Sequence, residues 1–545
     1  MPYLAQAATW RDQDLDPDTT AQLDDLLRRA EAGEEPARAE LESAFAGPLE
    51  FGTAGLRGPL GPGPARMNRV VVSQAAAGFG RWLTEHGHGG GRVLVGFDAR
   101  YKSADFARDT AEVLAAQGFE ALLTDRPVPT PVVAYGIGHY HCVAGVVVTA
   151  SHNPPQDNGY KVYLGDGSQI VPPVDAEIAA QIADVAQQPP RELPRSSGYT
   201  TVGDDLVAAY VARATSVIAP GPRELSWVYT AMHGVGARVL EAAAGQAGFP
   251  EPYLVAAQHD PDPSFPTVAF PNPEEPGAID LALELARQHQ VDVVIANDPD
   301  ADRCAAAAVV DGQWRMLTGD ELGALLADDA LRRGADGVYA CSIVSSSLLE
   351  RMVVAAGRPF QPTLTGFKWI GRVPGLAYGY EEAIGYCTDP AAVPDKDGIT
   401  AALRLLRLAA ELKAQGLTLA DRLDQIARQH GLHSTSQLSV RVADLSLISD
   451  AMARLRAQPP SALLGEPVTV DDLAAGGDLP PTDGVRLSGQ SLRVVVRPSG
   501  TEPKLKCYLE VRSSPEQSQQ VAAVRAEHAD RLARLRSEMA TALGL

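Results

Sequence analysis

The sequence has 545 residues, of which 45% are hydrophobic, and its formal net charge is −21. A chain of this length exceeds what one hydrophobic core can organise, so we expect three or four domains at roughly 100 to 200 residues each. The negative charge disfavours nucleic acid and anionic membranes as partners. An anionic ligand would have to be held by cations gathered at one place.

The cysteines and the N-terminal residues both indicate in which cellular compartment the protein is found. The five cysteines are scattered without a C-x-x-C pair, which argues against a disulfide framework or a zinc knuckle and favours a reducing compartment. Met1–Asp18 is polar and acidic, and no apolar run approaches the roughly 20 residues that span a bilayer. We therefore expect a cytoplasmic protein.

Hydrophobic periodicity predicts an α/β protein with a different C-terminal part. In chain order, we expect a helical arm over Ala21–Phe45, strands at Val93–Phe97 and Val143–Val148, and a helix over Phe106–Gln117. After a Pro-rich stretch near residue 190 the same alternation continues to about residue 430, with strands at Trp227–Ala231, Val291–Ile295 and Val338–Ser342. The remainder reads as strands closed by a terminal helix, including Gln437–Val442, Val485–Leu487, Leu492–Val496 and Leu505–Val511. The predicted domains are 1–202, 203–317 and 318–433, all mixed α/β, and a smaller α+β domain at 434–545.

The first chemical motif, Thr149–Pro155, follows the Val143–Val148 strand. Loops at the carboxyl ends of such strands are where α/β proteins place ligands. Asn158-Gly159 is a tight-turn signal, and a strand running back over Tyr160–Leu164 brings Lys161 towards Ser151. A hydroxyl on an exposed loop, the His152 imidazole and an ammonium group are then close together. The serine-hydrolase alternative fails, because the positions that G-x-S-x-G requires as glycine are threonine and asparagine.

The second motif, Asn297–Arg303, lies between two apolar runs and carries carboxylates at three alternate positions, Asp298, Asp300 and Asp302. Such carboxylates repel one another unless a cation binds them, and a site made only of oxygen favours magnesium or calcium. An EF-hand is excluded, because the glycine and the acidic residue that it requires next are Arg303 and Val309. A solvated acidic turn is the structural alternative.

The third motif, Arg497–Lys504, lies between two strands and offers a guanidinium, hydroxyls and a glycine, a combination that suits a phosphate dianion. It lacks the spacing of a nucleotide P-loop. Four shorter clusters, each weak alone, are Gly52–Gly58, Thr365–Gly371, Tyr380–Gly385 and Asp395–Gly398.

Together, T-A-S-H-N-P at 149–154, N-D-P-D-A-D-R at 297–303, Y-E-E-A-I-G at 380–385 and R-P-S-G-T at 497–501 resemble the four signature loops of the α-D-phosphohexomutase superfamily, in the same order. The residue sequences of these loops most resemble those of the branch that contains phosphoglucomutases, phosphopentomutases and glucose-1,6-bisphosphate synthases. The resemblance implies three similar mixed α/β domains and a smaller fourth domain around a central active-site cleft.

The resemblance also implies roles for individual residues. Ser151 would carry the phosphoryl group, and the three aspartates would hold Mg2+ together with a phosphoserine oxygen. His152 and Lys161 are the candidates for moving the hydroxyl proton, and Arg57 and Arg303 are predicted as further catalytic residues. The substrate would be bound by Glu381 at the sugar, by Arg497, Ser499, Gly500 and Thr501 at the distal phosphate, and by Thr365, Gly366, Lys368, Lys396 and Lys506.

The expected reaction is the interconversion of glucose 1-phosphate and glucose 6-phosphate through glucose 1,6-bisphosphate, in a monomer or homodimer whose partners are small sugar phosphates. One departure bears on the sugar, because Ala383 stands where many phosphoglucomutases have serine. A pentose phosphate or mannose phosphate is therefore an alternative substrate. The alternatives to a mutase are a metal-dependent sugar phosphatase, which needs no second phosphate cradle, and a non-catalytic sensor, which would not need the serine and aspartates.

Overall fold

A computed structural model of the chain describes residues 2–52, 55–442, 446–499, 504–514 and 520–544. The chain folds into two compact units. The first contains Met1–Ala306 and Gly385–Ala410, and the second contains Ala307–Ile384 and Glu411–Leu545. Among the described helices, none is long and apolar enough to cross a membrane.

The N-terminal arm is a group of helices with a small core of its own, in which Leu23, Leu27 and Leu41 are buried. We expected a helical arm over Ala21–Phe45, and the structure has two helices in most of this range. The helix is interrupted, because Gly33 adopts a left-handed φ of +93° and Pro36 lies in the first turn of the next helix. The helices of the arm are α1 (Pro2–Gln13), α2 (Pro17–Glu31) and α3 (Glu35–Ala44).

A six-stranded sheet follows, in the order β1-β5-β4-β2-β3-β6. Strands β4, β2, β3 and β6 are parallel, whereas β5 and β1 run antiparallel to their neighbours. Its elements are β1 (Leu56–Pro59), α4 (Arg69–Glu85), β2 (Arg92–Phe97), α5 (Ser103–Ala116), β3 (Glu120–Thr124), α6 (Thr130–His139), β4 (Ala144–Val148), β5 (Asp157–Leu164), α7 (Val174–Val185) and β6 (Thr200–Val202).

Helices cover both faces of this sheet, because successive side chains of a strand point to opposite faces. Val93 and Val95 belong to the core that contains Phe79 of α4 and Phe106 of α5. Leu94 points to the other face, where α6 packs so closely that a Cβ on Gly136 would lie 2.5 Å from the leucine side chain. The predicted α/β layering of this region is confirmed.

The first unit contains a second parallel arrangement, in which β7 pairs with both β8 and β9. The strand β9 is buried along its whole length. The chain then leaves the unit within β10 and returns to it at residue 385. The elements of this part are α8 (Asp204–Ser216), β7 (Trp227–Thr230), α9 (Ala237–Gln246), β8 (Tyr253–Leu254), α10 (Asp280–His289), β9 (Val293–Asn297), β10 (Cys304–Val310), β15 (Gly385–Cys387) and α14 (Gly398–Ala414).

The α/β part of the second unit is built around β12, which pairs in parallel with β13 and β14. Its first helix begins with a capping box between Thr318 and Glu321, which satisfies backbone N–H groups at the helix start. Its elements are β11 (Gln313–Met316), α11 (Gly319–Arg332), β12 (Val338–Ser342), α12 (Leu348–Ala355), β13 (Phe360–Thr363), α13 (Phe367–Ile370), β14 (Leu376–Glu381) and α15 (Leu419–His430).

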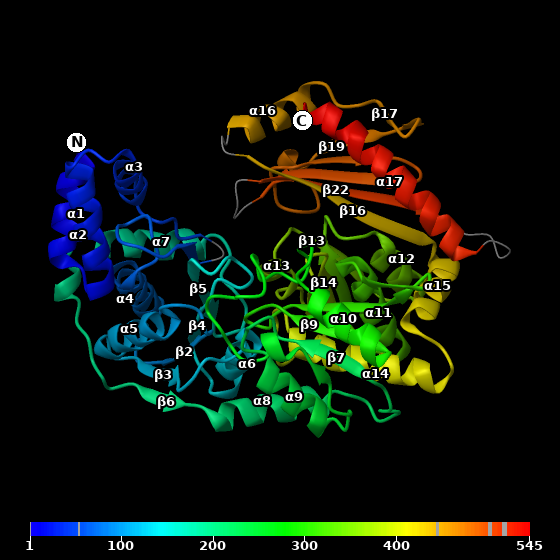
Figure 1. Cartoon of the computed structure of the whole chain (residues 1–545), viewed down its shortest axis with the longest axis horizontal. Helices are drawn as coiled ribbons and strands as arrows, with labels where there is room; N and C mark the ends of the chain where they lie inside the picture. Colours follow the sequence, from blue (N-terminus) through cyan, green and yellow to red (C-terminus); the bar gives the residue numbers. More distant parts are fainter. Residues whose placement is uncertain (1, 53–54, 443–445, 500–503, 515–519, 545) are drawn as a thin grey trace. The chain divides into compact units, whose positions relative to one another are not determined.

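The C-terminal part of the second unit is an antiparallel sheet in the order β16-β22-β21-β20-β19. Figure 1 shows the red helix α17 lying along one face of it. Val494 and Val496 pack in the core on that face, whereas the alternate residue Val495 packs with Tyr508 and Ile343. The elements are β16 (Leu432–Arg441), α16 (Ser446–Ala457), β17 (Ala462–Leu463), β18 (Glu466–Pro467), β19 (Thr469–Asp472), β20 (Val485–Ser488), β21 (Leu492–Pro498), β22 (Lys504–Ser513) and α17 (Val521–Leu543).

Candidate active site

Ser151 lies in the loop that joins β4 to β5 in the first unit. It is only 2% exposed, so the expectation of an exposed loop position was wrong. The Ser151 hydroxyl donates a hydrogen bond to the carboxylate oxygen Oδ2 of Asp298 at 2.8 Å. The backbone of Ser151 is left-handed, with φ of +51°, and its N–H donates to the Thr149 hydroxyl at 2.9 Å.

The predicted tight turn at Asn158-Gly159 is also wrong. Both residues lie inside β5, opposite Gly58 and Arg57 of β1. Glycine is required at 159 for a packing reason, since a Cβ there would lie 2.6 Å from the carbonyl oxygen of Thr149. Lys161 still returns towards Ser151, because β5 pairs antiparallel with β4 and places Lys161 opposite Val147.

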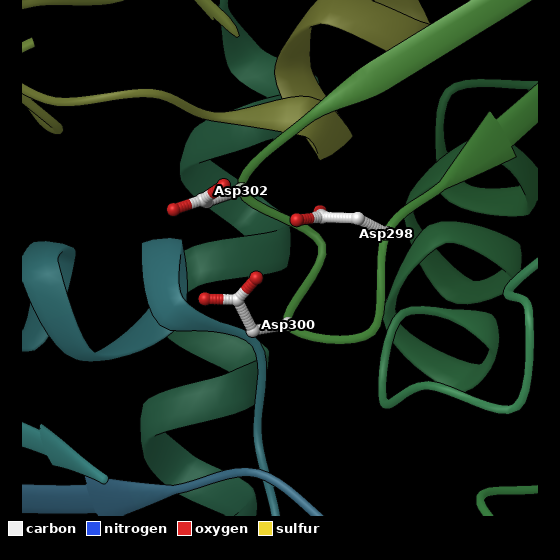
Figure 2. Close-up of side chains that lie close together, drawn as sticks. All are labelled: Asp298, Asp300 and Asp302. Atoms are coloured by element: carbon white, nitrogen blue, oxygen red, sulfur yellow. The ribbon is translucent and has the colours of Figure 1, made fainter. Parts of the chain in front are cut away.

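The three aspartates converge in the loop between β9 and β10 (Figure 2). All three are fully buried, and one oxygen from each lies within 4.8 Å of the others. The loop is held closed by Asn297, whose side-chain amide donates to the carbonyl oxygen of Arg303 at 2.6 Å. Ala301 takes a left-handed φ of +54° so that the alternate side chains can face one point.

Cations surround this carboxylate cluster. The Lys161 ammonium donates to one oxygen of Asp300 and one of Asp302, each at 2.8 Å. The Lys396 ammonium lies 3.3 Å from the same Asp302 oxygen. The Arg303 guanidinium lies 3.8 Å from both Asp298 and Asp302. The groups that contact the three aspartates thus come from the β4–β5 loop, from β5 and from the segment before α14.

The charges shift one another's pKa values. Burial, together with Asp300 and Asp302, holds the pKa of Asp298 well above its usual value. Burial also opposes ionisation of Asp302, but Lys161 and Lys396 outweigh it and lower the pKa of that carboxyl. Burial and the nearby Arg303 hold the pKa of His152 well below its usual value, so the imidazole is neutral near pH 7. Its Nδ1 lies 3.2 Å from the Ser151 hydroxyl oxygen.

The carboxylate cluster has the donor set of a hard divalent cation. Among the described residues, oxygen Oδ1 of Asp300 and oxygen Oδ1 of Asp302 are buried and have no hydrogen-bond partner. A buried carboxylate oxygen in that state is costly unless it binds a cation. Oxygen-only coordination by three carboxylates suits Mg2+ or Ca2+, so the residues present fit a metal.

The second unit carries the residues predicted to bind substrate, apart from Lys396. Glu381 ends β14, and the neighbouring Glu382 carboxylate accepts hydrogen bonds from the hydroxyls of Ser342 and Ser345, each at 2.9 Å. Gly366 precedes α13 with φ of +103°, in the segment that also carries Thr365, and the Lys368 ammonium lies 5.8 Å from the Trp369 ring centroid.

Arg497 and Lys506 are directly opposite one another in the pair β21–β22. Burial and the nearby Glu382 and Glu381 raise the pKa of Tyr508, whereas a hydrogen bond with Arg497 lowers it, and the net effect is a raised pKa. The Tyr508 phenol therefore lies within electrostatic reach of Arg497 on β21 and of Glu381 and Glu382 at the end of β14. Ser499 N–H donates to the carbonyl oxygen of Lys504 at 2.8 Å, and the predicted residues Gly500 and Thr501 lie outside the described residues.

Arg57 is placed on β1 in the first unit, next to the strand that carries Lys161. Burial and Arg303 lower its pKa. The first unit thus contains Ser151, His152, Lys161, Arg57, Arg303, Lys396 and the three aspartates, and the second contains Thr365, Gly366, Lys368, Glu381, Arg497, Ser499 and Lys506.

Two residues that hold the charge cluster were not predicted as site residues, although Asp395 belongs to the short cluster Asp395–Gly398 singled out in the sequence. The Thr130 hydroxyl donates to Asp300 at 2.7 Å from the start of α6. Asp395 accepts from the Tyr163 hydroxyl at 2.9 Å and lies 3.6 Å from the Lys396 ammonium. Thr130 follows β3 at the carboxyl edge of the sheet, which is where α/β proteins place ligands. The argument that singled out Ser151 therefore applies to Thr130 as well.

The chain matches all four models of one family, described as phosphoglucomutase/phosphomannomutase. Alpha/beta/alpha domain I matches residues 48–189, domain II matches 208–311, domain III matches 318–429, and the C-terminal domain matches 439–528. These matches confirm the predicted fold class of three α/β/α domains and a different C-terminal domain.

Individual relatives agree with the family models. The chain is 46% identical to a "Probable phosphomannomutase" of Haemophilus influenzae, with 82% of this chain and 93% of that protein covered. It is 34% identical to a "Phosphopentomutase" of Mus musculus, with 94% and 90% covered. Its structure resembles that of a "putative phosphomannomutase" from Thermus thermophilus, at 27% identity and a TM-score of 0.67, with 86% of this chain and 96% of that chain covered. The chain therefore belongs to the phosphoglucomutase/phosphomannomutase family, within the α-D-phosphohexomutase superfamily of phosphosugar mutases.

Proposed function

We propose that this mutase works with Mg2+, passes the phosphoryl group through Ser151, and acts on a pentose 1-phosphate. The observation that carries the mechanism is the 2.8 Å hydrogen bond from the Ser151 hydroxyl to Asp298, a member of the buried carboxylate cluster. A phosphoryl group on Ser151 would therefore be formed next to the three aspartates. Asp298, Asp300 and Asp302 would hold Mg2+, which when bound neutralises charge on the phosphoryl oxygens.

Phosphoryl transfer depends mainly on positioning and on charge neutralisation, and the side chains of the first unit support both. Lys161 orients two of the aspartates, and Lys396 adds a second positive charge beside them. The His152 Nδ1 lies 3.2 Å from the Ser151 oxygen, which is within reach of the hydroxyl proton. In the second unit, Glu381 would bind sugar hydroxyls while Arg497 and Ser499 hold the phosphate that is not reacting.

Two observations support a pentose as the sugar, namely the residue type at Ala383 and the name of one relative. The methyl group of Ala383 cannot donate or accept the hydrogen bond that a serine would offer a hexose. The mouse relative, which covers nearly the whole chain, is named for a pentose. The first expectation from the sequence, glucose 1-phosphate, has less support than these alternatives. Mannose 1-phosphate is the second candidate, because the relative at 46% identity is named as a phosphomannomutase.

A mutase assay over ribose, mannose, glucose and N-acetylglucosamine 1-phosphates tests the sugar, with and without a catalytic amount of the matching bisphosphate. We expect the highest kcat/KM with ribose 1-phosphate. A higher kcat/KM with mannose or glucose 1-phosphate would replace the pentose proposal with that hexose.

Intact-mass measurement tests the covalent mechanism separately from the sugar. We expect a single phosphate adduct on the wild-type protein after incubation with a sugar bisphosphate, and no adduct on Ser151→Ala. If Ser151→Ala stays active, or if the wild-type protein never carries phosphate, transfer through Ser151 is wrong.

A further inference from the structure

A buried guanidinium lies beneath the loop that carries Ser151. Arg100 follows β2 and is 5% exposed. Its Nη2 donates to the carbonyl oxygens of Ser151 and Asn153, at 2.6 and 2.5 Å. Its Nη1 donates to the carbonyl oxygens of Pro154 and Asp157, at 2.8 and 3.2 Å. One side chain therefore binds four main-chain carbonyls of the β4–β5 connection.

Three of these carbonyls, those of Ser151, Asn153 and Pro154, lie in the loop between β4 and β5, and the fourth belongs to Asp157, the first residue of β5. Pro154 and Pro155 have no N–H group, and Ser151 has a left-handed backbone, which is strained for a non-glycine residue. A carbonyl left without a donor in such a loop would lose the stabilisation of its hydrogen bond. Arg100 thus stabilises the strained conformation at the residue where it matters for the proposed reaction.

The guanidinium is itself held from several sides. Its Nε lies 3.3 Å from Asp98, and the other oxygen of that carboxylate accepts from the Arg100 N–H at 3.0 Å and from the Ser103 hydroxyl at 2.7 Å. Its central carbon lies 4.9 Å from the ring centroid of Phe265. A planar guanidinium bound in this way is held in one orientation. A lysine ammonium has three donors on a flexible stem and cannot reproduce it.

We propose that Arg100 is a positioning residue, which sets the backbone conformation and location of Ser151 and thereby the rate at which the serine accepts and returns the phosphoryl group. This inference rests on the proposed role of Ser151. Arg100 acts on main-chain carbonyls of the loop, so the effect of losing it falls on phosphoryl transfer rather than on affinity for the sugar. Displacement of a reacting atom by about 1 Å can cost on the order of 100-fold in rate.

The test compares Arg100→Lys with Arg69→Met, a control in the same unit. Arg69 binds the buried Asp109 through two hydrogen bonds of 2.7 Å, and neither residue belongs to the charge cluster around Ser151. For Arg100→Lys we expect kcat, and the rate at which a sugar bisphosphate phosphorylates the protein, to fall by about 10- to 100-fold, with KM within about threefold of wild type. For Arg69→Met we expect a lower Tm but an unchanged kcat in the folded protein.

Hydrogen exchange measures the loop directly and does not depend on catalysis. In Arg100→Lys we expect faster exchange of the amides between Ser151 and Asp157, and unchanged exchange in β4. A milder variant, Ser103→Ala, removes a hydrogen bond that orients Asp98, and we expect a smaller loss of kcat in the same direction. This variant decides the matter if Arg100→Lys does not fold.

Wild-type kcat in folded Arg100→Lys, or unchanged exchange in the loop, would overturn the proposal, as would a rise in KM as large as the fall in kcat. If Ser151 never carries phosphate in the wild-type protein, the proposed function fails. The exchange measurement would still decide whether Arg100 holds the loop.

Discussion

The two units carry functional residues in different surroundings. In the first unit, Ser151, the three aspartates, Lys161 and Lys396 are all at most 6% exposed and are joined by hydrogen bonds and ion pairs. In the second unit, Lys368, Glu381, Arg497 and Lys506 are only partly buried. The groups around Ser151 are thus preorganised in a buried network that includes Lys396, whereas the other described groups proposed to recognise substrate remain partly accessible to solvent. Substitutions should therefore affect kcat in the first unit and KM or sugar preference in the second.

A substitution in the carboxylate cluster should lower kcat more than any substitution in the second unit. Asp300→Asn keeps the shape of the side chain but removes the charge that Lys161 and the proposed Mg2+ bind. We expect kcat to fall by at least about 100-fold, and we expect chelation to silence the wild-type enzyme until Mg2+ is restored. The measurement is kcat against Mg2+ concentration.

The matched control for Asp300→Asn is Asp389→Asn. Asp389 is a buried carboxylate of the same unit that pairs with Arg213. Its substitution should leave Mg2+ activation unchanged. Full activity of the wild-type enzyme in excess chelator, or of Asp300→Asn, would contradict a catalytic metal at this cluster.

Arg497→Ala should have the next largest effect, and this effect should appear mainly in KM. A hydrogen bond to a charged group contributes about 1.5–3 kcal/mol, which corresponds to a rise in KM of roughly 10- to 150-fold. Stability should change little, because the side chain is partly exposed. Steady-state kinetics and the Tm measure both quantities. Arg486→Ala is the control, since this arginine of β20 pairs with Asp471 at the surface. Equal kinetic losses in both variants would contradict a role of Arg497 in binding phosphate.

Ala383→Ser should sharpen the sugar preference by a smaller amount. The new hydroxyl offers a hexose one more hydrogen bond, which contributes about 0.5–1.5 kcal/mol. We expect kcat/KM for hexose phosphates to rise by about 2- to 10-fold relative to ribose 1-phosphate. Ala356→Ser, at the exposed end of α12, controls for a general effect of the added hydroxyl. An unchanged ratio would mean that residue 383 does not set the sugar preference.

The smallest expected effect concerns stability in the second unit. Burial lowers the pKa of His528 to about 4, and its two ring nitrogens lie 2.9 and 2.8 Å from the hydroxyls of Ser434 and Ser513. The unfolded chain binds a proton at this histidine near pH 6.5, before the folded chain does, so the stabilisation is lost as the pH falls from about 6.5 to about 4. We expect the Tm of the wild-type protein to fall more steeply over this range than that of His528→Gln. Parallel pH profiles would contradict this assignment.

The sequence by itself determined the repeated α/β order, the antiparallel C-terminal strands and the four family loops. These features depend on local periodicity and on residues that are consecutive in the chain, such as Asn297–Arg303 and Arg497–Lys504. Strand and helix positions were accordingly close, with β12 predicted at its observed bounds, Val338–Ser342. The domain boundaries remain a prediction, as do the roles of the site residues.

Only the tertiary structure decided which distant residues meet. The pairing of β5 with β1 and β4 explains why Asn158-Gly159 is not a turn and why Gly159 is needed, and neither fact can be read from the local sequence. Ser151 is buried, and its hydroxyl binds Asp298, which is far away in the chain. Arg100 could have been suspected, because it follows a strand at the carboxyl edge of the sheet, but its four carbonyl partners could not. Long-range packing sets these contacts, because they depend on how sheet strands and loops are brought together rather than on the preferences of neighbouring residues.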